Sequence, residues 1–425
     1  MKNCNKSFYI ATLGCKINQY ETEAIKEAWE KEGYKCEEDL SKAEFFILNS
    51  CAVTDRAVQD VRKSVRRAIK INPKIKVIIT GCAAEIFEEE LKRLPNIYML
   101  VPQREKRALL APFKKGIKND FQINKFPRAR AVVKIQDGCS HFCSYCIVPF
   151  ARGKPVSRDP DEILKEIKRL VENGFKEVIL SGINLGQFEF KGGDLWDFLV
   201  WLEDKLTDAY GLCVRVRLSS LDPGLLTEKA LKVLERSKLI CRHLHISVQS
   251  GSERILRLMN RSHYTPDLIR DFVYSLKEIW NIFGLSGDFL IGFPSETEED
   301  FLKTYLLCKD LPFTHGHVFS FSPRPMTKAY NMKEQVDWKI KKKRNKMLRD
   351  LFEKKKKEFL NFLCKKRHIL DVIIEDTKHL GGMSEYYVYC IFDRKIEAKW
   401  GDRVKAVAKE PVNDELIVEP LYEPS

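Results

Sequence analysis

The chain has 425 residues, of which 44% are hydrophobic and 32% are charged. These proportions are ordinary for a globular protein in water, and the length suggests about three domains. No stretch approaches the roughly 18 consecutive apolar residues that a membrane-spanning helix needs, which excludes a helical membrane protein. The formal net charge of +14 favours a polyanionic partner such as RNA, although a general bias towards lysine would give the same balance.

Cysteine usage points to metal ligands. The chain has 13 cysteines, which would form a disulfide framework only in an oxidising compartment. The short apolar run near the N-terminus is interrupted by Lys16 and makes a poor signal peptide, so we expect a cytoplasmic protein without a membrane partner. In a reducing compartment, clustered cysteines are more often metal ligands than disulfides.

Residues 1–115 are expected to form an N-terminal domain with a doubly wound parallel sheet. Apolar runs predict strands at 8–13, 44–50, 76–80 and 97–101, and the stretches between them predict helices at 19–32, 55–71 and 85–94. Strands that alternate with helices in this way are typical of parallel sheets with helices on both faces.

Three cysteines occupy equivalent positions in this pattern. Cys15, Cys51 and Cys82 each follow a predicted strand, at the start of the turn into the next helix. Because the carboxyl ends of parallel strands meet at one edge of the sheet, the three thiols should converge in space. We interpret them as ligands of a four-iron cluster with one open iron. The alternative is that they are buried and act as small hydrophobic residues.

The middle of the chain predicts a second domain, over 131–330, after a polar and basic linker at 116–130. Six strands are expected, at 132–136, 177–181, 214–218, 243–248, 287–291 and 316–321, with helices between them such as 160–173 and 265–283. Six strand–helix units are too few for a closed eight-fold barrel. We therefore expect a partial (β/α)6 barrel whose chemistry lies at the carboxyl ends of its strands.

The loop after the first of these strands carries a second cysteine triad. Cys139, Cys143 and Cys146 form a C-x3-C-x2-C pattern, and the next cysteine is as distant as Cys213. Clusters that only transfer electrons usually have four cysteine ligands, so three thiols leave one iron open for chemistry. The alternative is a tetrahedral zinc site with His141 as the fourth ligand.

The segment DGCSHFCSYCIVPFARG around this triad resembles the signature of the radical S-adenosylmethionine (SAM) superfamily. The resemblance implies a 4Fe-4S cluster whose open iron binds SAM and, once reduced, cleaves it to a 5′-deoxyadenosyl radical. Arg152 and Arg158 follow the loop, and their guanidinium groups suit either the SAM carboxylate or an RNA phosphate. A surface ion pair is the alternative for both.

Candidate SAM contacts lie at the ends of the predicted strands. The segments SGIN (181–184) and IGFP (291–294) resemble those that meet the SAM amino group and adenine in the superfamily. Singly, such residues are more often plain turn residues, but together they lie on one rim. The candidates are Tyr145, Gly182, Asn184, Ser219, Gln249 and Gly292.

The segments TLGCKINQYETE, LNSCAV and ITGCAAE around the first triad resemble the N-terminal module of methylthiotransferases. In that family the module holds an auxiliary 4Fe-4S cluster, whose open iron carries the sulfur to be inserted. Asn18 and Asn49 match positions beside the cysteines and are candidates for hydrogen bonds to cluster or substrate, with turn capping as the alternative. No catalytic residue is expected beyond the six cluster ligands.

The motifs LGCKINQYETE, RHLHISVQSG and MNRSHYT resemble the subgroup that acts on N6-threonylcarbamoyladenosine at tRNA position 37, beside the anticodon. The implied reaction adds a methylthio group to adenine C2, with one SAM giving the methyl group and another the radical. The implied partners are the tRNA anticodon loop and an electron donor such as flavodoxin or ferredoxin. Alternatives are a sister enzyme for isopentenyladenosine or a ribosomal protein, a non-catalytic iron–sulfur RNA-binding protein, and a two-cluster electron carrier.

The last hundred residues predict a basic helix and a small β domain. The helix, at 333–368, carries 15 Lys/Arg against 5 Asp/Glu, which suits RNA phosphates or a merely solvated face. Residues 369–425 predict strands at 369–375, 386–392, 404–409 and 415–420, with a turn at Gly381-Gly382. The expected β-barrel is similar to the TRAM RNA-binding domain that ends this family. Tyr386, Tyr387 and Tyr389 are expected either to stack on bases or to pack in the core.

Overall fold

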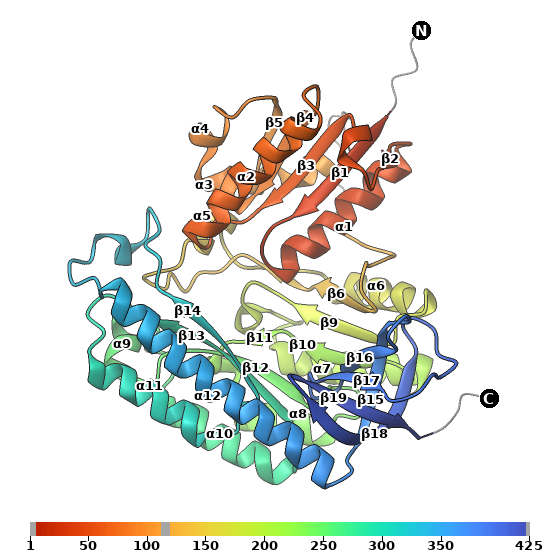
Figure 1. Ribbon diagram of the computed structural model, residues 1–425, viewed down its shortest axis with the longest axis vertical. Coiled ribbons are helices and arrows are strands. Elements are labelled where there is room, and N and C mark those ends of the chain that lie inside the picture. The colour runs from red at the N-terminus through yellow and green to blue at the C-terminus, as the bar shows by residue number, and fades with distance from the viewer. Residues whose placement is uncertain (1–5, 112–119, 422–425) are drawn as a thin grey trace. The chain divides into compact units, whose positions relative to one another are not determined.

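The computed structural model describes residues 6–111 and 120–421, and the chain divides into two compact units (Figure 1). The first unit comprises residues 1–126, 137–156 and 322–331, and the second comprises 127–136, 157–321 and 332–425. The predicted linker at 116–130 lies partly outside the described residues. Its described part over 120–129 contains neither helix nor strand.

The first unit is built on a five-stranded parallel sheet with the strand order β2–β1–β3–β4–β5. Its strands are β1 (Ser7–Thr12), β2 (Lys35–Cys36), β3 (Phe45–Ser50), β4 (Lys76–Gly81) and β5 (Ile97–Pro102). Its helices include α1 (Lys16–Lys31), α2 (Asp55–Ile71), α3 (Cys82–Ile86), α4 (Glu88–Leu91) and the 3-10 segments η1 (Leu40–Lys42) and η2 (Gln103–Leu110). The predicted doubly wound sheet is confirmed. The predicted helix at 85–94 is instead two short helices, because the backbone leaves the helical conformation at Phe87.

Helices cover both faces of this sheet because neighbouring strand residues point in opposite directions. Phe45 packs on Trp29 of α1, with ring centroids 5.6 Å apart. Phe46, the next residue, joins a core with Val61 and Val65 of α2. The strand order reverses between β1 and β3, and the crevice at the carboxyl ends of such a pair is the place where doubly wound sheets bind ligands.

The second unit contains two parallel sheets, with the orders β10–β9–β6 and β11–β12–β13–β14. The strands are β6 (Arg130–Lys134), β9 (Glu177–Ser181), β10 (Arg215–Leu218), β11 (Ser220–Leu221), β12 (His243–Gln249), β13 (Gly284–Ile291) and β14 (His315–Ser320). The helices between them are α6 (Pro160–Glu172), α7 (Leu195–Tyr210), α8 (Glu228–Arg236), α9 (Glu253–Leu258), α10 (Pro266–Ile279) and α11 (Glu298–Asp310). This is the open strand–helix arrangement that the sequence predicts.

The basic helix α12 (Trp338–Lys365) runs along β14 in Figure 1. Phe352 fixes it to the sheet through ring contacts with Phe289 and Phe313, at centroid distances of 5.2 and 5.9 Å. The helix begins later than residue 333, because Asp337 caps it by accepting a hydrogen bond from the Lys339 amide.

The C-terminal residues form a closed five-stranded barrel, as predicted, with the order β15–β16–β17–β19–β18. Its strands are β15 (Ile369–Asp376), β16 (Gly381–Ser384), β17 (Tyr389–Phe392), β18 (Arg403–Val412) and β19 (Glu415–Pro420). The prediction of a turn at Gly381-Gly382 is wrong, since both glycines lie in β16. A Cβ atom at Gly382 would collide with the Ile373 carbonyl, so glycine allows β15 and β16 to pair there.

A buried ionic cluster joins the barrel strands to this C-terminal barrel. Glu177, at the start of β9, is fully buried and lies 2.6 Å from both Arg215 and Arg217. The two arginines also donate hydrogen bonds to backbone carbonyls of the C-terminal barrel, at Asp371 and Ser384 respectively. The amino ends of the strands are therefore attached to the C-terminal barrel.

Two of the tyrosines proposed for base stacking pack inside the second unit. Tyr387 stacks on His243 with ring centroids 4.8 Å apart, and the Arg217 guanidinium lies over the Tyr387 ring, 5.5 Å from its centroid. Tyr386 is buried, with its hydroxyl 2.8 Å from His368 Nε2. The packing alternative is therefore correct for both residues.

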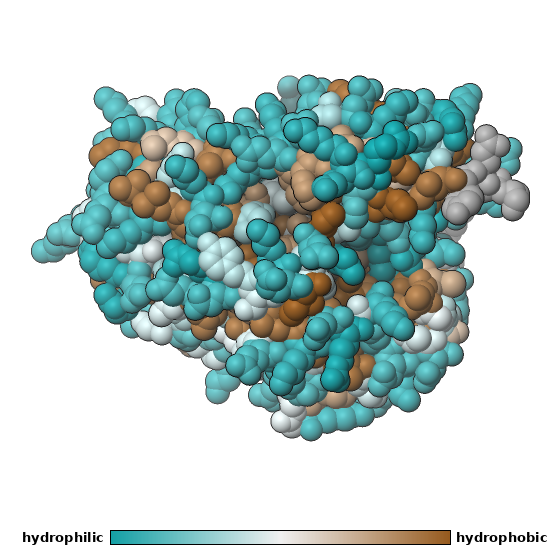
Figure 2. All heavy atoms as spheres, turned by 90° about the horizontal axis from the view of Figure 1, so that it is seen from below, coloured by the Kyte–Doolittle hydropathy of each residue, from teal (hydrophilic) through white to brown (hydrophobic). Residues whose placement is uncertain are grey.

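The face of the molecule drawn in Figure 2 is mostly hydrophilic, and its hydrophobic residues form small separate areas. Among the described residues, the structure contains no helix that is both long and apolar enough to cross a membrane.

Candidate active site

The first cysteine triad lies at the carboxyl edge of the first unit's sheet. Cys15 precedes α1, Cys51 follows β3, and Cys82 begins α3 directly after β4. Cys51 and Cys82 are nearly buried, with exposed fractions of 8% and 5%, whereas Cys15 is exposed. Gly14 adopts φ +101°, and a Cβ atom there would lie 2.7 Å from the Cys51 Cβ. The glycine thus brings the Cys15 loop close to Cys51.

The thiols of this triad interact electrostatically. The pKa of the Cys51 thiol is raised to about 11, chiefly by burial and also by the Cys82 and Cys15 thiols, while Arg152 opposes the increase. Burial also raises the pKa of Cys82, and Arg152 and Lys106 oppose that increase. Three thiols on one edge, with two cations beside them, match the donor set of an iron–sulfur cluster that needs anionic ligands.

Asn18 and Asn49 hold the loops of this triad together. The Asn18 amide donates to the Leu13 carbonyl at 2.9 Å and to the Ser50 carbonyl at 3.0 Å, so it bridges the segments before Cys15 and Cys51. The Asn49 amide donates to the Asn18 carbonyl at 2.9 Å. Both side chains are buried and bonded within the protein.

The second triad lies in a loop that returns on itself. The Cys139 amide donates to the Gly153 carbonyl at 3.0 Å, and the Cys146 amide donates to the Cys143 carbonyl at 2.9 Å. The short helix α5 (Val148–Arg152) follows the last cysteine. This loop belongs to the first unit, together with the sheet that bears the first triad.

Apolar packing attaches the loop to that sheet. Ile147 and Ala151 of the cluster segment are buried in the same hydrophobic core as Ala83 and Ala84 of α3. Helix α3 begins at Cys82, so both triads rest on one shared core.

Arg152 connects the two triads. Its guanidinium is buried and lies 2.8 Å from Asp137, before the second triad, and 3.1 Å from Glu21 of α1. It also donates to the Asn18 side-chain oxygen at 2.6 Å and hydrogen-bonds Cys82. The alternative of a surface ion pair does not describe Arg152, because its ion pairs are buried. Arg158 has a different position in the second unit, where it lies 2.7 Å from the buried Glu166.

Two residues of this network escaped the sequence reasoning. Glu21 is fully buried between Arg152 and Lys106, and the Lys106 ammonium lies 2.6 Å from its carboxylate and 3.0 Å from the Asn49 amide oxygen. A signal for Glu21 existed, since it lies three and four residues before Ala24 and Ile25 on the apolar side of α1. Nothing comparable marks Lys106.

A late segment of the chain also contacts both triads' loops. Residues 322–331, after the last barrel strand, belong to the first unit and include η5 (Lys328–Asn331). The buried Arg324 forms an ion pair with Asp55 and donates to the Ala52 carbonyl, next to Cys51, at 3.4 Å. The Ala329 amide donates to the Ser144 carbonyl at 2.7 Å, inside the second triad.

The candidate SAM contacts of the barrel lie at the ends of its strands in the second unit, and Tyr145 lies in the cluster loop of the first. Ser219 Oγ is buried and has no hydrogen-bond partner among the described residues, so it is available to a ligand. The Asn184 side-chain oxygen accepts a hydrogen bond from the Gly186 backbone N–H, which is a contact typical of a turn residue. Gln249 and Gly292 both adopt positive φ, at +63° and +71°.

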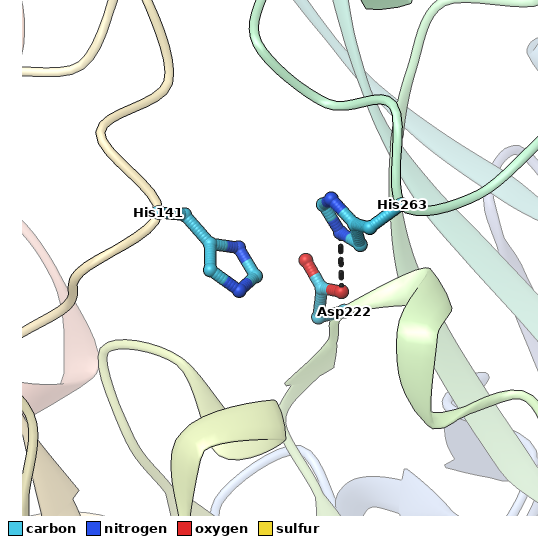
Figure 3. Close-up of side chains that lie close together, drawn as sticks. All are labelled: His141, Asp222 and His263. Atoms are coloured by element: carbon cyan, nitrogen blue, oxygen red, sulfur yellow. Dashed lines mark hydrogen bonds and ion pairs between the residues drawn. The ribbon is translucent and has the colours of Figure 1, made fainter.

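The same rim carries an ion cluster that the sequence did not reveal. Asp222, directly after β11, lies 2.8 Å from His263 (Figure 3) and 3.0 Å from Arg261. Burial alone raises the pKa of Asp222, but these two partners outweigh it and hold the pKa at about 2. The carboxylate is thus ionised at neutral pH.

Comparisons with known proteins agree with this arrangement. Residues 7–101 match the family described as "Uncharacterized protein family UPF0004", and residues 133–308 match the "Radical SAM superfamily". The radical SAM methyltransferase TsrM from Kitasatospora setae has a similar structure, with a TM-score of 0.58 and 12% identity over 76% of this chain and 75% of TsrM. This likeness concerns the fold alone.

Curated relatives cover most of the chain. The "Threonylcarbamoyladenosine tRNA methylthiotransferase MtaB" of Bacillus subtilis (strain 168) is 34% identical over 86% of this chain and 84% of that protein. The protein of that name from Aquifex aeolicus (strain VF5) is 33% identical over 87% and 93%. The "tRNA-2-methylthio-N(6)-dimethylallyladenosine synthase" of Pelagibacter ubique (strain HTCC1062) is 34% identical over 92% and 93%. The chain therefore belongs to the radical SAM methylthiotransferases that modify tRNA.

Proposed function

We propose that this enzyme converts N6-threonylcarbamoyladenosine at tRNA position 37 to its 2-methylthio derivative, using two 4Fe-4S clusters and two SAM-dependent steps. The observation that carries the proposal is the buried link between the two cysteine triads. Arg152 hydrogen-bonds Cys82 of the first triad and pairs with Asp137 beside the second. Methylthiolation needs a radical centre and a sulfur carrier at a fixed separation, and one rigid core under both triads meets that need.

The six cysteines divide into two ligand sets. Cys139, Cys143 and Cys146 would hold the cluster that supplies reductive cleavage of SAM. Cys15, Cys51 and Cys82 would hold the auxiliary cluster that supplies the sulfur. The chain's own contribution is electrostatic: Arg152 and Lys106 place buried positive charge beside Cys82, which stabilises thiolate ligands of an anionic cluster.

The carboxyl rim of the barrel supplies SAM contacts in this proposal. Gly182 lies close to Gln136. The Gln136 side-chain oxygen accepts a hydrogen bond from the Asn184 backbone N–H at 2.9 Å. The Ser219 hydroxyl, which has no partner among the described residues, is a further proposed contact at this rim. Gly292 is another, although its N–H already donates to the Glu296 carboxylate at 2.9 Å. The other proposed cofactor-binding residues are Tyr145, in the cluster loop, and Gln249, at the end of β12.

Helix α12 suits the tRNA backbone. It carries twelve Lys/Arg against three Asp/Glu, and most of these cations are solvent-exposed. Trp338, at its first turn, is 63% exposed beside Lys341 and Lys342, which combines a stacking surface with phosphate-binding charge. Arg344 is an exception, because it is buried in a pair with Glu296 at 2.7 Å.

The remaining partners follow from the chemistry. Reductive cleavage of SAM consumes electrons, so a small donor such as flavodoxin or ferredoxin must deliver them, and we place the enzyme with its tRNA in the cytoplasm. Relatives named for threonylcarbamoyl and for dimethylallyl substrates are both 30–34% identical to this chain. An enzyme for isopentenyladenosine is the second candidate.

Mass spectrometry of tRNA nucleosides from a deletion strain tests the substrate. We expect loss of the methylthio group from threonylcarbamoyladenosine alone, with its return on expression of the gene in trans. Loss from isopentenyladenosine instead would establish the second candidate. Anaerobic reconstitution tests the chemistry, because the enzyme should bind about eight irons and form 5′-deoxyadenosine when reduced. Reconstituted protein that forms none would refute the radical mechanism.

A further inference from the structure

A polar cluster crosses the sheet β11–β14 on the face away from α12. Ser220 of β11 pairs in register with His245 of β12, and Asp288 of β13 pairs with His317 of β14. The neighbouring residue Phe289 points the other way, to Phe352 of α12. Because side chains alternate along a strand, the polar cluster occupies the inner face of this part of the barrel.

Asp288 organises the cluster. Its carboxylate oxygens lie 3.0 Å from His245 Nε2 and 3.1 Å from His317 Nδ1, and the Ser220 hydroxyl donates to it at 3.2 Å. Burial alone raises the pKa of Asp288, but the hydrogen bonds from the two histidines outweigh it and keep the pKa well below its usual range. The carboxylate is therefore ionised and fixes both imidazole rings.

His317 is the member of the cluster that faces open space. Its side chain is 45% exposed, against 14% for His245. It also lines a hollow of about 550 Å³ with His315, Phe319, Arg349 and Lys356. The hollow includes two carboxylates, of Glu353 and Asp414, and Asp414 lies 3.6 Å from Lys356. His315 contacts His317 edge to face, at 4.8 Å between ring centroids.

We propose that His317, positioned by Asp288 and His245, binds the N6 substituent of the target adenosine and selects a polar, acidic substituent over an apolar one. This inference rests on the proposed function. His317 lies three residues before the end of β14, or roughly 10 Å below the carboxyl rim, where an extended substituent would reach when the adenine lies at the rim.

The chemistry of the cluster favours this choice of substituent. With Nδ1 directed at Asp288, His317 presents its polar Nε2 edge to the substituent. A threonylcarbamoyl group offers a carboxylate, a hydroxyl and amide hydrogens to such groups. An isopentenyl group would desolvate them without replacing their hydrogen bonds, which sites of this kind reject strongly. The separations of 3.0 and 3.1 Å between the Asp288 carboxylate oxygens and the two ring nitrogens lie within the range of hydrogen bonds.

The test compares two tRNA substrates with reconstituted holoenzyme. Transcripts that carry threonylcarbamoyladenosine or isopentenyladenosine at position 37 are assayed for methylthiolation, and the ratio of the two kcat/KM values is measured for wild type, His317→Ala and His317→Asn. We expect His317→Ala to lower the ratio about 100-fold in favour of the apolar substrate. His317→Asn, which keeps a donor for Asp288, should recover part of it. The control is His379→Ala, an exposed histidine of the C-terminal barrel.

Each outcome is decisive. A ratio that stays at the wild-type value in His317→Ala, with wild type active on threonylcarbamoyl tRNA, overturns this inference and leaves the proposed function intact. Wild type that modifies neither tRNA overturns the proposed function itself. Stoichiometric zinc in the purified wild type that disappears in His317→Ala also overturns the inference, because the cluster would then be a metal site. If His317→Ala fails to fold, Asp288→Asn provides the same comparison.

Discussion

Glu21→Gln tests the buried network that joins the two cysteine triads. Glu21 is fully buried, and its carboxylate faces two cations, Lys106 at 2.6 Å and Arg152 at 3.1 Å. The substitution keeps the size of the side chain and removes its charge. Arg152 would retain Asp137 as an anionic partner, whereas Lys106 would face neutral amide oxygens, such as that of Asn49, in place of a carboxylate.

The expected cost follows from that asymmetry. Breaking a buried ion pair by removing one partner typically costs about 3–5 kcal/mol, whereas an exposed pair contributes about 0.2–1 kcal/mol. Burial already lowers the pKa of Lys106, so release of its proton would limit the loss. We therefore expect the free energy of unfolding of the first unit to fall by about 3 kcal/mol.

Urea unfolding of the reconstituted protein measures this loss, and hydrogen–deuterium exchange should assign it to α1 and β3. The matched control is Glu30→Gln, an exposed carboxylate on the same helix, which should change stability by less than about 0.5 kcal/mol. A loss below about 1 kcal/mol for Glu21→Gln would show that the pair behaves as a surface pair and that the network does not hold the triads together.

Three further predictions test other parts of the molecule. Cys51→Ala should keep SAM cleavage and lose sulfur insertion, measured as 5′-deoxyadenosine and methylthio product in one assay; unchanged product would refute the role of the first triad. Burial raises the pKa of Glu177, but its arginine partners lower it further, to about 2 against an ordinary 4.5, so its stabilisation is present above pH 4.5 and is lost towards pH 2. Glu177→Gln should therefore unfold more easily in urea at pH 7, by about 3 kcal/mol, and show a smaller slope below pH 4.5; an unchanged slope would contradict this. Replacing Lys342, Lys346 and Arg349 of α12 with Gln should weaken tRNA binding and reduce the salt dependence of the dissociation constant by about one unit per lost phosphate contact; equal salt slopes would exclude α12 from the interface.

The elements that the sequence predicted well are those set by local periodicity. Strand and helix bounds in the first unit agree within a few residues, because alternating and helical apolar patterns are properties of short windows. The same patterns put Cys15, Cys51 and Cys82 at strand ends, and the parallel topology then brings them to one edge. Local spacing also indicated the triad of Cys139, Cys143 and Cys146.

Errors arose where one close contact overrides the local pattern. Gly381 and Gly382 look like a turn, yet they form a strand because β15 approaches too closely for a Cβ atom. Such positions depend on contacts with distant residues that a short window of sequence does not contain.

The sequence by itself determined the chemistry of this protein: two sets of three thiols, each at the end of a strand, in a chain with a basic helix. Only the tertiary structure decided what surrounds them. Glu21 meets Lys106 across 85 residues and Arg152 across 131, and Asp288 meets His245 and His317 from neighbouring strands. The partner of a buried charge depends on which elements pack together, and that packing is set by the whole core rather than by any local pattern.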